Sequence, residues 1–120
     1  MLKDLKGSFC YDCRMQEIKL LKFTFKHGKK QSWIDWCNEL QRRSGEVMES
    51  LKAEGVRIEA CFISEQENAC YYLMQAGDLE ESKNVSAGSD RKIDSEHAAM
   101  RLATLDFVEK LTPLFYFHES

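Results

Sequence analysis

The chain has 120 residues, of which 43% are hydrophobic and 31% are charged, and its formal net charge is −3 with the histidines neutral. This length allows one domain with its own core, and the composition is that of a folded globular chain. The small negative charge gives no overall attraction to nucleic acid or to an anionic membrane. No apolar run reaches the ~20 residues of a membrane-spanning helix. We therefore expect neither nucleic acid nor a membrane as a partner.

The first residues stand apart from the rest of the chain. Residues 1–15 show no sustained periodicity, and they hold Cys10 and Cys13, whose spacing to other ligands fits neither a zinc finger nor a thioredoxin-like motif. We treat residues 1–15 as an N-terminal appendage of uncertain order and residues 16–120 as a single domain. The alternative is a protein that begins at Met15. The lack of an apolar signal region and the odd number of cysteines favour free thiols in the cytoplasm.

A strand and a long helix are the first predicted elements. Side chains alternate over residues 17–26, so that Leu21, Phe23 and Phe25 share one face while Ile18 and Leu20 share the other. Residues 29–54 then show apolar side chains at spacings of three, four and seven, which predicts an amphipathic helix. Ser32 is its expected N-cap, Gly55 its expected C′ residue, and Gly45 a position for a bend.

A hairpin and a short helix come next. Residues 56–65 and 69–76 each alternate as strands do, and the short turn between them predicts an antiparallel pair. A polar helix follows over residues 79–85, with Asp78 as its N-cap.

The last predicted elements are a helix over residues 94–110 and a strand over residues 114–118, separated by Pro113. The whole order is β-α-β-β-α-β. This order is typical of a ferredoxin-like α+β fold, with a four-stranded antiparallel sheet and the helices on one face.

Apolar residues on both sheet faces predict a cover for the face away from the helices. The simplest cover is the same face of a second copy, which gives a homodimer with the architecture of a dimeric α/β barrel. The alternative is a monomer whose second face is covered by residues 1–15.

The chain from Glu17 onward resembles DUF6176, a bacterial family of uncharacterised proteins. The resemblance rests on three short motifs: Lys19-Leu20-Leu21-Lys22-Phe23, Glu54-Gly55-Val56-Arg57-Ile58-Glu59, and Ile93-Asp94 followed by Glu96-His97. It implies membership of the wider dimeric α/β-barrel group, which includes rhamnose mutarotases, antibiotic-biosynthesis monooxygenases and haem-degrading enzymes. The resemblance itself confers no activity.

Three ionisable residues at the expected start of the last helix form the candidate catalytic group. Asp94 as N-cap and Glu96 near the positive end of the helix are explained by capping and the helix dipole. His97 is not explained in this way, and the helix terminus should keep it neutral. A neutral imidazole can serve as a general base, as a haem ligand or as a structural hydrogen-bonding residue. Three residues from one turn are too few for a metal site, so we predict none.

Aromatic and acidic residues on the neighbouring elements could line a cleft between helices and sheet. The candidate binding residues are Tyr71, Tyr72, Tyr116, Glu59 and Trp36. Such a cleft would suit a sugar or an aromatic metabolite, while core packing explains the same residues without a ligand.

Two hypotheses of different classes follow. The first is a small-molecule enzyme or binder that uses the cleft near His97, with an unknown cofactor if it has one. The second is a dimeric structural or interaction module without an active site. The direction in which the His97 ring points distinguishes them.

Overall fold

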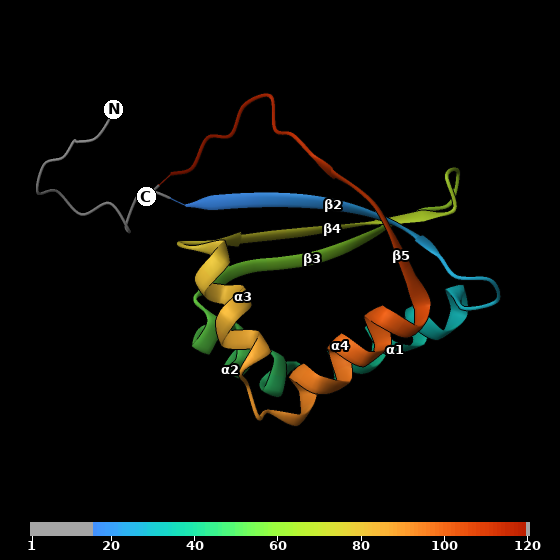
Figure 1. Cartoon of the computed structure of the whole chain (residues 1–120), viewed down its shortest axis with the longest axis horizontal. Helices are drawn as coiled ribbons and strands as arrows, with labels where there is room; N and C mark the ends of the chain where they lie inside the picture. Colours follow the sequence, from blue (N-terminus) through green and yellow to red (C-terminus); the bar gives the residue numbers. More distant parts are fainter. Residues whose placement is uncertain (1–15, 120) are drawn as a thin grey trace, which may run out of the picture.

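The computed structural model describes residues 16–119, which form one antiparallel sheet with four helices on a single face of it (Figure 1). The elements, in chain order, are β2 (Glu17–Phe25), α1 (Lys30–Arg42), α2 (Ser44–Glu54), β3 (Val56–Ser64), β4 (Ala69–Ala76), α3 (Leu79–Ala87), α4 (Lys92–Thr104) and β5 (Leu105–Leu111). The strands lie in the order β3-β4-β2-β5. The predicted α+β class and the four antiparallel strands are therefore confirmed. Among the described residues, no helix is both long and apolar enough to cross a bilayer.

The helix-facing side of the sheet carries the core. In the β2–β4 pairing Leu21 lies opposite Tyr72 and Phe23 opposite Cys70, as the predicted alternation requires. Phe23, Cys70 and Tyr72 pack with Trp33 and Trp36 of α1 in the main buried cluster. Helix α1 thus covers the centre of the sheet with its two tryptophans.

A β-bulge near the start of β3 changes the face of one residue. The pairing with β4 shifts between Val56 and Ile58, so that Val56 is buried in a second cluster with Leu51 and Ala76. Ile58 lies on the opposite face and is 46% exposed. A bulge places two residues against one and reverses the alternation beyond it, which the sequence pattern did not reveal.

The predicted long helix is two helices, and its predicted N-cap is wrong. The chain breaks at Arg43, whose backbone leaves the helical region, and α2 begins at Ser44. The first helix begins at Lys30, so Ser32 lies inside it. Gly55 does end α2, with a φ of 73° that an L side chain rarely adopts.

The short helix α3 agrees with the prediction at its start. Asp78 accepts a hydrogen bond from the Glu81 N–H at 2.9 Å, as an N-cap does. The Ser82 hydroxyl donates to the Glu54 carbonyl at 2.6 Å, which joins α3 to the end of α2.

The predicted last helix and last strand are both corrected by the structure. Helix α4 ends at Thr104, whose carbonyl accepts a hydrogen bond from the Lys26 N–H at 2.8 Å, and β5 pairs with β2 from there. Leu102 and Leu105 have the spacing of a helical face, but Leu105 begins a strand and Leu102 is 77% exposed. Residues 114–118 form no strand, since β5 already occupies the edge of β2.

The C-terminal segment instead crosses the sheet face that lies away from the helices (Figure 1). Its Tyr116 hydroxyl is hydrogen-bonded to the side-chain amide of Gln75, which lies on that face of β4. Leu114, Phe115 and Phe117 are 98%, 77% and 86% exposed. The predicted cover by residues 1–15, and the C-x-x-C pair at Cys10 and Cys13, lie outside the described residues.

Candidate functional site

The structure places His97 inside α4 rather than in the first turn of a helix capped by Asp94. The helix starts at Lys92 with Arg91 as its N-cap, so the predicted N-cap is wrong. Asp94 instead accepts a hydrogen bond from the Ser50 hydroxyl of α2. His97 consequently points into the interface between α1, α4 and the sheet.

A chain of hydrogen bonds runs through His97 from the core towards the edge of the sheet. The indole N–H of Trp36 donates to His97 Nδ1 at 2.8 Å, and the Tyr72 hydroxyl lies 2.7 Å from His97 Nε2. The same hydroxyl is hydrogen-bonded to Glu59 Oε2. The four residues come from α1, α4, β4 and β3. The hydrogen-bond chain therefore connects the helices α1 and α4 to the neighbouring strands β4 and β3.

The direction of this chain follows from its first member. An indole N–H can only donate, so His97 Nδ1 must accept, and the neutral ring carries its proton on Nε2. That proton is donated to the Tyr72 oxygen, and the Tyr72 O–H is then donated to the Glu59 carboxylate. Both nitrogens of His97 are therefore engaged.

Burial sets the charge states along the chain. Desolvation, with a further contribution from the positive charge of Arg101, lowers the pKa of His97 to about 4. Desolvation also raises the pKa of Glu59, against the hydrogen bond from Tyr72. Burial raises the pKa of the Tyr72 hydroxyl well above its ordinary value. His97 is thus neutral at physiological pH, and Glu59 is a carboxyl group whose proton affinity is increased.

Glu59 and His97 are the partly exposed members of this chain, with side chains that are 21% and 20% exposed, while Trp36 and Tyr72 are buried. Glu59 lies on the helix-facing side of β3, opposite Met74. The positive charges of Arg101 and Lys19 act on it. Met74 of β4 lies between Glu59 on β3 and Lys19 on β2. The pKa of Lys19 is lowered by partial burial and by neighbouring cations, Arg101 foremost. A carboxylate and two cations therefore surround a half-buried position on the sheet.

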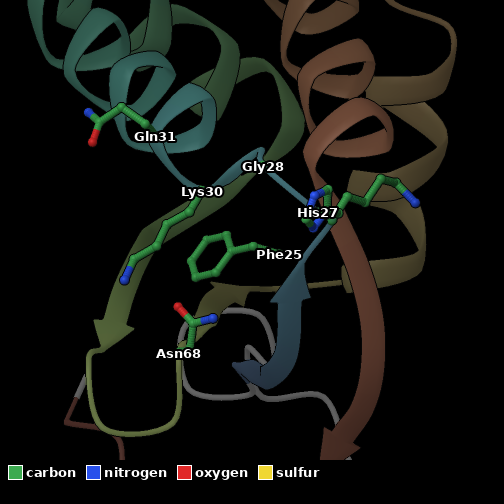
Figure 2. Close-up of a pocket in the computed structure, with 7 residues that line it drawn as sticks. Phe25, His27, Gly28, Lys30, Gln31 and Asn68 are labelled. Carbon is green, nitrogen blue, oxygen red and sulfur yellow. The ribbon is translucent and has the colours of Figure 1, made fainter.

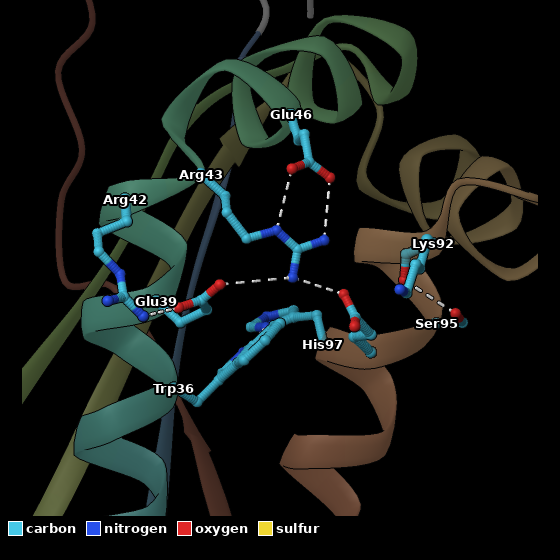
Figure 3. A network of polar contacts seen from close by, with 9 residues as sticks. Trp36, Glu39, Arg42, Arg43, Glu46, Lys92, Ser95 and His97 are labelled. Atoms are coloured by element: carbon cyan, nitrogen blue, oxygen red, sulfur yellow. Dashed lines mark hydrogen bonds and ion pairs between the residues drawn. The ribbon is translucent and has the colours of Figure 1, made fainter.

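Arg43 organises the helix side of the site (Figure 3). Its guanidinium forms ion pairs with Glu46 at 2.9 Å and Glu96 at 2.7 Å, and it lies 6.0 Å from the Trp36 ring. The Trp36 ring in turn lies beside the His97 ring, with centroids 6.1 Å apart. Glu96 thus ties α4 to the junction of α1 and α2, and it does not contact His97 through any of these bonds.

The structure separates the other predicted binding residues from this group. Tyr71 is hydrogen-bonded to Glu67, and Tyr116 to Gln75, on the opposite face of the sheet. Of the residues named from the sequence, Trp36, Tyr72, Glu59 and His97 come together.

Two residues of the site were missed from the sequence. Lys19 occupies a strand position that shares its face with Leu21 and Phe23, and a charged residue on a core-facing position is a recognisable signal. Arg101 lies four residues after His97, one helical turn along α4.

A cavity lies elsewhere, at the end of β2 and the start of α1 (Figure 2). Its volume is about 430 Å³, and its lining includes Phe25, His27, Lys30 and Asn68. Among the described residues, no cluster of three or more His, Cys, Asp or Glu side chains has an arrangement suited to a metal ion.

The fold and site define an α+β protein whose antiparallel sheet is covered by helices on one face, with a polar chain at their interface. The model of DUF6176, a family of unknown function, matches residues 16–119, and the chain belongs to this family. No curated protein is significantly similar to it in sequence. The crystal structure of protein SO0527 from Shewanella oneidensis is similar, with a TM-score of 0.52 and 14% identity over 82% of this chain and 90% of that one. At this identity the likeness concerns the fold alone.

Proposed function

We propose that the protein is a small-molecule enzyme that transfers protons on a polyhydroxylated substrate such as a sugar, with Glu59 as the proton acceptor. The observation that carries the proposal is the hydrogen-bond chain from Trp36 through His97 and Tyr72 to Glu59. It orients a partly exposed carboxyl group whose pKa is raised, mainly by burial. A raised pKa brings a carboxylate closer to the range in which a general base works.

Lys19 complements Glu59 in this proposal. A carboxyl group with a raised pKa and an amine with a lowered pKa on the same sheet face suit an acid–base pair. Glu59 would take the proton of a substrate hydroxyl while the Lys19 ammonium gives one to a second oxygen, and the reverse transfers restore both groups. Arg101 would hold a substrate oxygen.

His97 is a positioning residue in this account. Its one lone pair accepts the Trp36 N–H, so it has none left to take a proton or to bind haem iron without breaking that bond. A sugar is favoured over an aromatic ligand because the groups facing solvent are charged, whereas the Trp36 and Tyr72 rings are buried in the core.

Thermal-shift screening of the full chain against a library of sugars, sugar acids and aromatic acids tests the proposal. A ligand at 100 times its Kd stabilises the native state by about 2.7 kcal/mol. We expect sugars or sugar acids to shift wild type and to lose this shift in Glu59→Gln and Lys19→Met, while the exposed control Lys52→Met keeps it. Catalysis is then followed as anomer interconversion by NMR. Hits that bind all variants equally would reject Glu59 as the site.

We further propose a ferredoxin-like classification and a homodimer through the open sheet face, in the manner of a dimeric α/β barrel. The strand order β3-β4-β2-β5, with helical connections on one face, supports the classification. Ile58 and Phe62 support the second copy, because they are 46% and 57% exposed on that face. The exposed apolar side chains of the C-terminal segment, which lies over the same face, support it as well. The unpaired thiols of Cys37, Cys61 and Cys70 favour a cytoplasmic location.

The second candidate function is a dimeric interaction module without catalysis. The specific observation in its favour is that both nitrogens of His97 are engaged and that the cavity of about 430 Å³ lies at Phe25 and Lys30 instead. A wild-type dimer that binds no member of the library would favour this candidate.

A further inference from the structure

The buried hydroxyl of Ser50 touches two carboxyl groups where α2 meets α4. The Ser50 oxygen lies 3.0 Å from Glu54 Oε2, one turn along α2, and it is also hydrogen-bonded to Asp94 Oδ1 of α4. Ser50 is 5% exposed, and both acidic residues are half-buried. The second oxygen of Asp94, Oδ2, is buried and has no hydrogen-bond partner within the described part of the chain. None of these hydrogen bonds belongs to the chain through His97.

The number of hydrogens at Ser50 does not match the number of acceptors around it. A serine hydroxyl carries one hydrogen, and an ionised carboxylate can only accept. If both carboxyl groups were ionised, Ser50 would donate to one of them and turn its oxygen lone pairs towards the other. One added proton removes this conflict, because a protonated carboxyl group donates to the Ser50 oxygen while the Ser50 O–H donates to the remaining carboxylate. The geometry therefore fits two carboxyl groups that share one proton.

The ends of the two helices decide which carboxyl group holds the proton. Glu54 is the last residue of α2, where the helix dipole disfavours a negative charge, and Asp94 lies in the first turn of α4, where the dipole favours one. Burial raises the pKa of Glu54, and the negative charges of Asp94 and of Glu59 on β3 raise it further. Hydrogen bonds from Ser50 and from Ser86 on α3 act in the opposite direction without cancelling this effect. The proton consequently belongs to Glu54 and the charge to Asp94.

No cation of the described residues takes the place of this proton. Neither Glu54 nor Asp94 forms an ion pair within residues 16–119. The cations at the contact between α2 and α4 are Arg43 and Lys92, and both act on Glu46 near the other end of α2. A shared proton is therefore the group that can join the two carboxyl groups across the helices.

We propose that Glu54, Ser50 and Asp94 form a latch between α2 and α4 that is closed by a proton on Glu54. In the closed state the Glu54 O–H donates to Ser50 and the Ser50 O–H donates to the Asp94 carboxylate, so that one continuous path of hydrogen bonds joins the helices. When the proton leaves, two half-buried carboxylates compete for one hydrogen, and their repulsion releases α4 from the end of α2.

The latch joins the two elements that position the candidate site. Helix α2 passes through Gly55 directly into β3, which carries Glu59, and α4 carries His97 three residues after Asp94. Opening the latch would therefore loosen the position of His97 relative to Glu59. This consequence for catalysis rests on the proposed function, whereas the latch itself does not.

The latch should make the folded state less stable as the pH rises. The pKa of Glu54 is raised above its ordinary value of 4.5, so the folded chain holds this proton more tightly than the unfolded chain does. The contribution is fully present below the unfolded pKa and is lost as the pH rises through the folded pKa. Glu59 acts in the same direction and His97 in the opposite one. The test therefore has to follow the Glu54 carboxyl group itself.

Carboxyl ¹³C NMR titration of the full chain, from about pH 3 to about pH 9, provides this test. In wild type the Glu54 signal should titrate above 4.5. In Asp94→Asn its midpoint should fall by about one pH unit, because a negative neighbour is lost and the new amide donates to Ser50, which leaves the Ser50 O–H for Glu54. The exposed control Glu49→Gln should leave the Glu54 midpoint unchanged. A wild-type midpoint at or below 4.5, or an equal midpoint in Asp94→Asn, would overturn the latch.

Amide hydrogen exchange of residues 92–97 gives a second readout that does not depend on the Asp94 variant. After correction for the intrinsic pH dependence of exchange, wild type should lose protection several-fold as the pH rises through the Glu54 midpoint. Glu54→Gln should keep its protection, because the amide donates to Ser50 at every pH. An equal loss in both proteins would reject the latch. Neither readout uses a ligand, so a sugar screen without hits would reject the proposed function and leave the latch intact.

Discussion

His97 shows how one neighbour can decide the chemistry of a histidine. The indole nitrogen of Trp36 always carries its hydrogen and can only donate. A hydrogen on His97 Nδ1 would therefore point at the Trp36 N–H. Burial and Arg101 oppose the imidazolium in addition. The ring therefore orients Tyr72 and, through it, the Glu59 carboxyl group, which is the reacting group in our proposal.

The stability of the protein should depend on pH through His97. Its pKa is about 4 in the folded state against an ordinary 6.5, so the unfolded chain binds the proton more readily in this interval. Stability is therefore lost as pH falls through the unfolded value towards the folded one, by about 2 kcal/mol between pH 7.5 and pH 5. Glu59, whose pKa is raised, contributes with the opposite sign at lower pH.

Urea unfolding of His97→Gln at both pH values measures this contribution. The variant should lose less stability on acidification than wild type does. The exposed residue His27 provides a matched control, and His27→Gln should keep the wild-type difference. An unchanged pH dependence in His97→Gln would contradict a buried neutral imidazole.

Replacing Trp36 by phenylalanine should raise the pKa of His97 towards 6.5. The substitution removes the N–H that faces Nδ1 and leaves a ring in its place. Trp33→Phe is the control, because the Trp33 ring lies 5.8 Å from the His97 ring without a hydrogen bond to it. NMR titration of the His97 ring protons separates the two variants. Equal pKa values in both would show that burial alone sets the value.

The sequence predicted four members of the polar chain but not their arrangement. Trp36 appears in it as a residue of an apolar helical stripe, and Tyr72 and Glu59 as strand positions. Their convergence depends on which helix crosses which strand, and alternation within one element does not contain that information. Asp94 was explained as a cap, whereas its partner Ser50 lies on another helix.

At the scale of elements, the break between α1 and α2 is stabilised by tertiary contacts. No proline or glycine stands at Arg43, and its side chain binds Glu46 of α2 and Glu96 of α4. Local propensity therefore predicted one helix over residues 29–54 with a bend at Gly45, two residues after the observed break. The same reason explains the error after Thr104, where pairing with β2 outweighs a helical spacing of leucines.

Arg43→Met should lower the midpoint of urea unfolding more than Arg42→Met does. Arg43 is 19% exposed and joins three helices, while Arg42 is 77% exposed and pairs with Glu39 of its own helix. Exposed pairs within one helix contribute little. Equal midpoints for the two variants would mean that the junction is held by its apolar packing.

At the scale of the whole molecule, the face away from the helices is the surface through which we propose that the homodimer forms. The chain's own C-terminal segment covers part of it through Tyr116, and leaves Phe115 and Phe117 exposed. A monomer rarely exposes this many large apolar side chains. Apolar residues on both faces of the sheet predicted that the second face needs a cover, while the course of residues 112–119 over it could not be read from the sequence.

Sedimentation equilibrium should show a dimer for wild type and a monomer for Phe62→Asp. Phe62 is 57% exposed on the open face, and a buried unpaired charge there would oppose association. Leu102→Asp is the matched control, since Leu102 is 77% exposed on α4 at the helix side. If Leu102→Asp dissociated the dimer and Phe62→Asp did not, the interface would lie on the helices instead.

The most direct test of the central claim is the protonation of the His97 ring itself. Long-range ¹⁵N–¹H correlation spectra of the full chain at neutral pH report which ring nitrogen carries hydrogen. The hydrogen-bond chain predicts a neutral ring with a proton on Nε2 and none on Nδ1, unchanged down to pH 5. A proton on Nδ1, or an imidazolium at pH 6, would contradict the Trp36–His97–Tyr72–Glu59 chain and the role of Glu59 that rests on it.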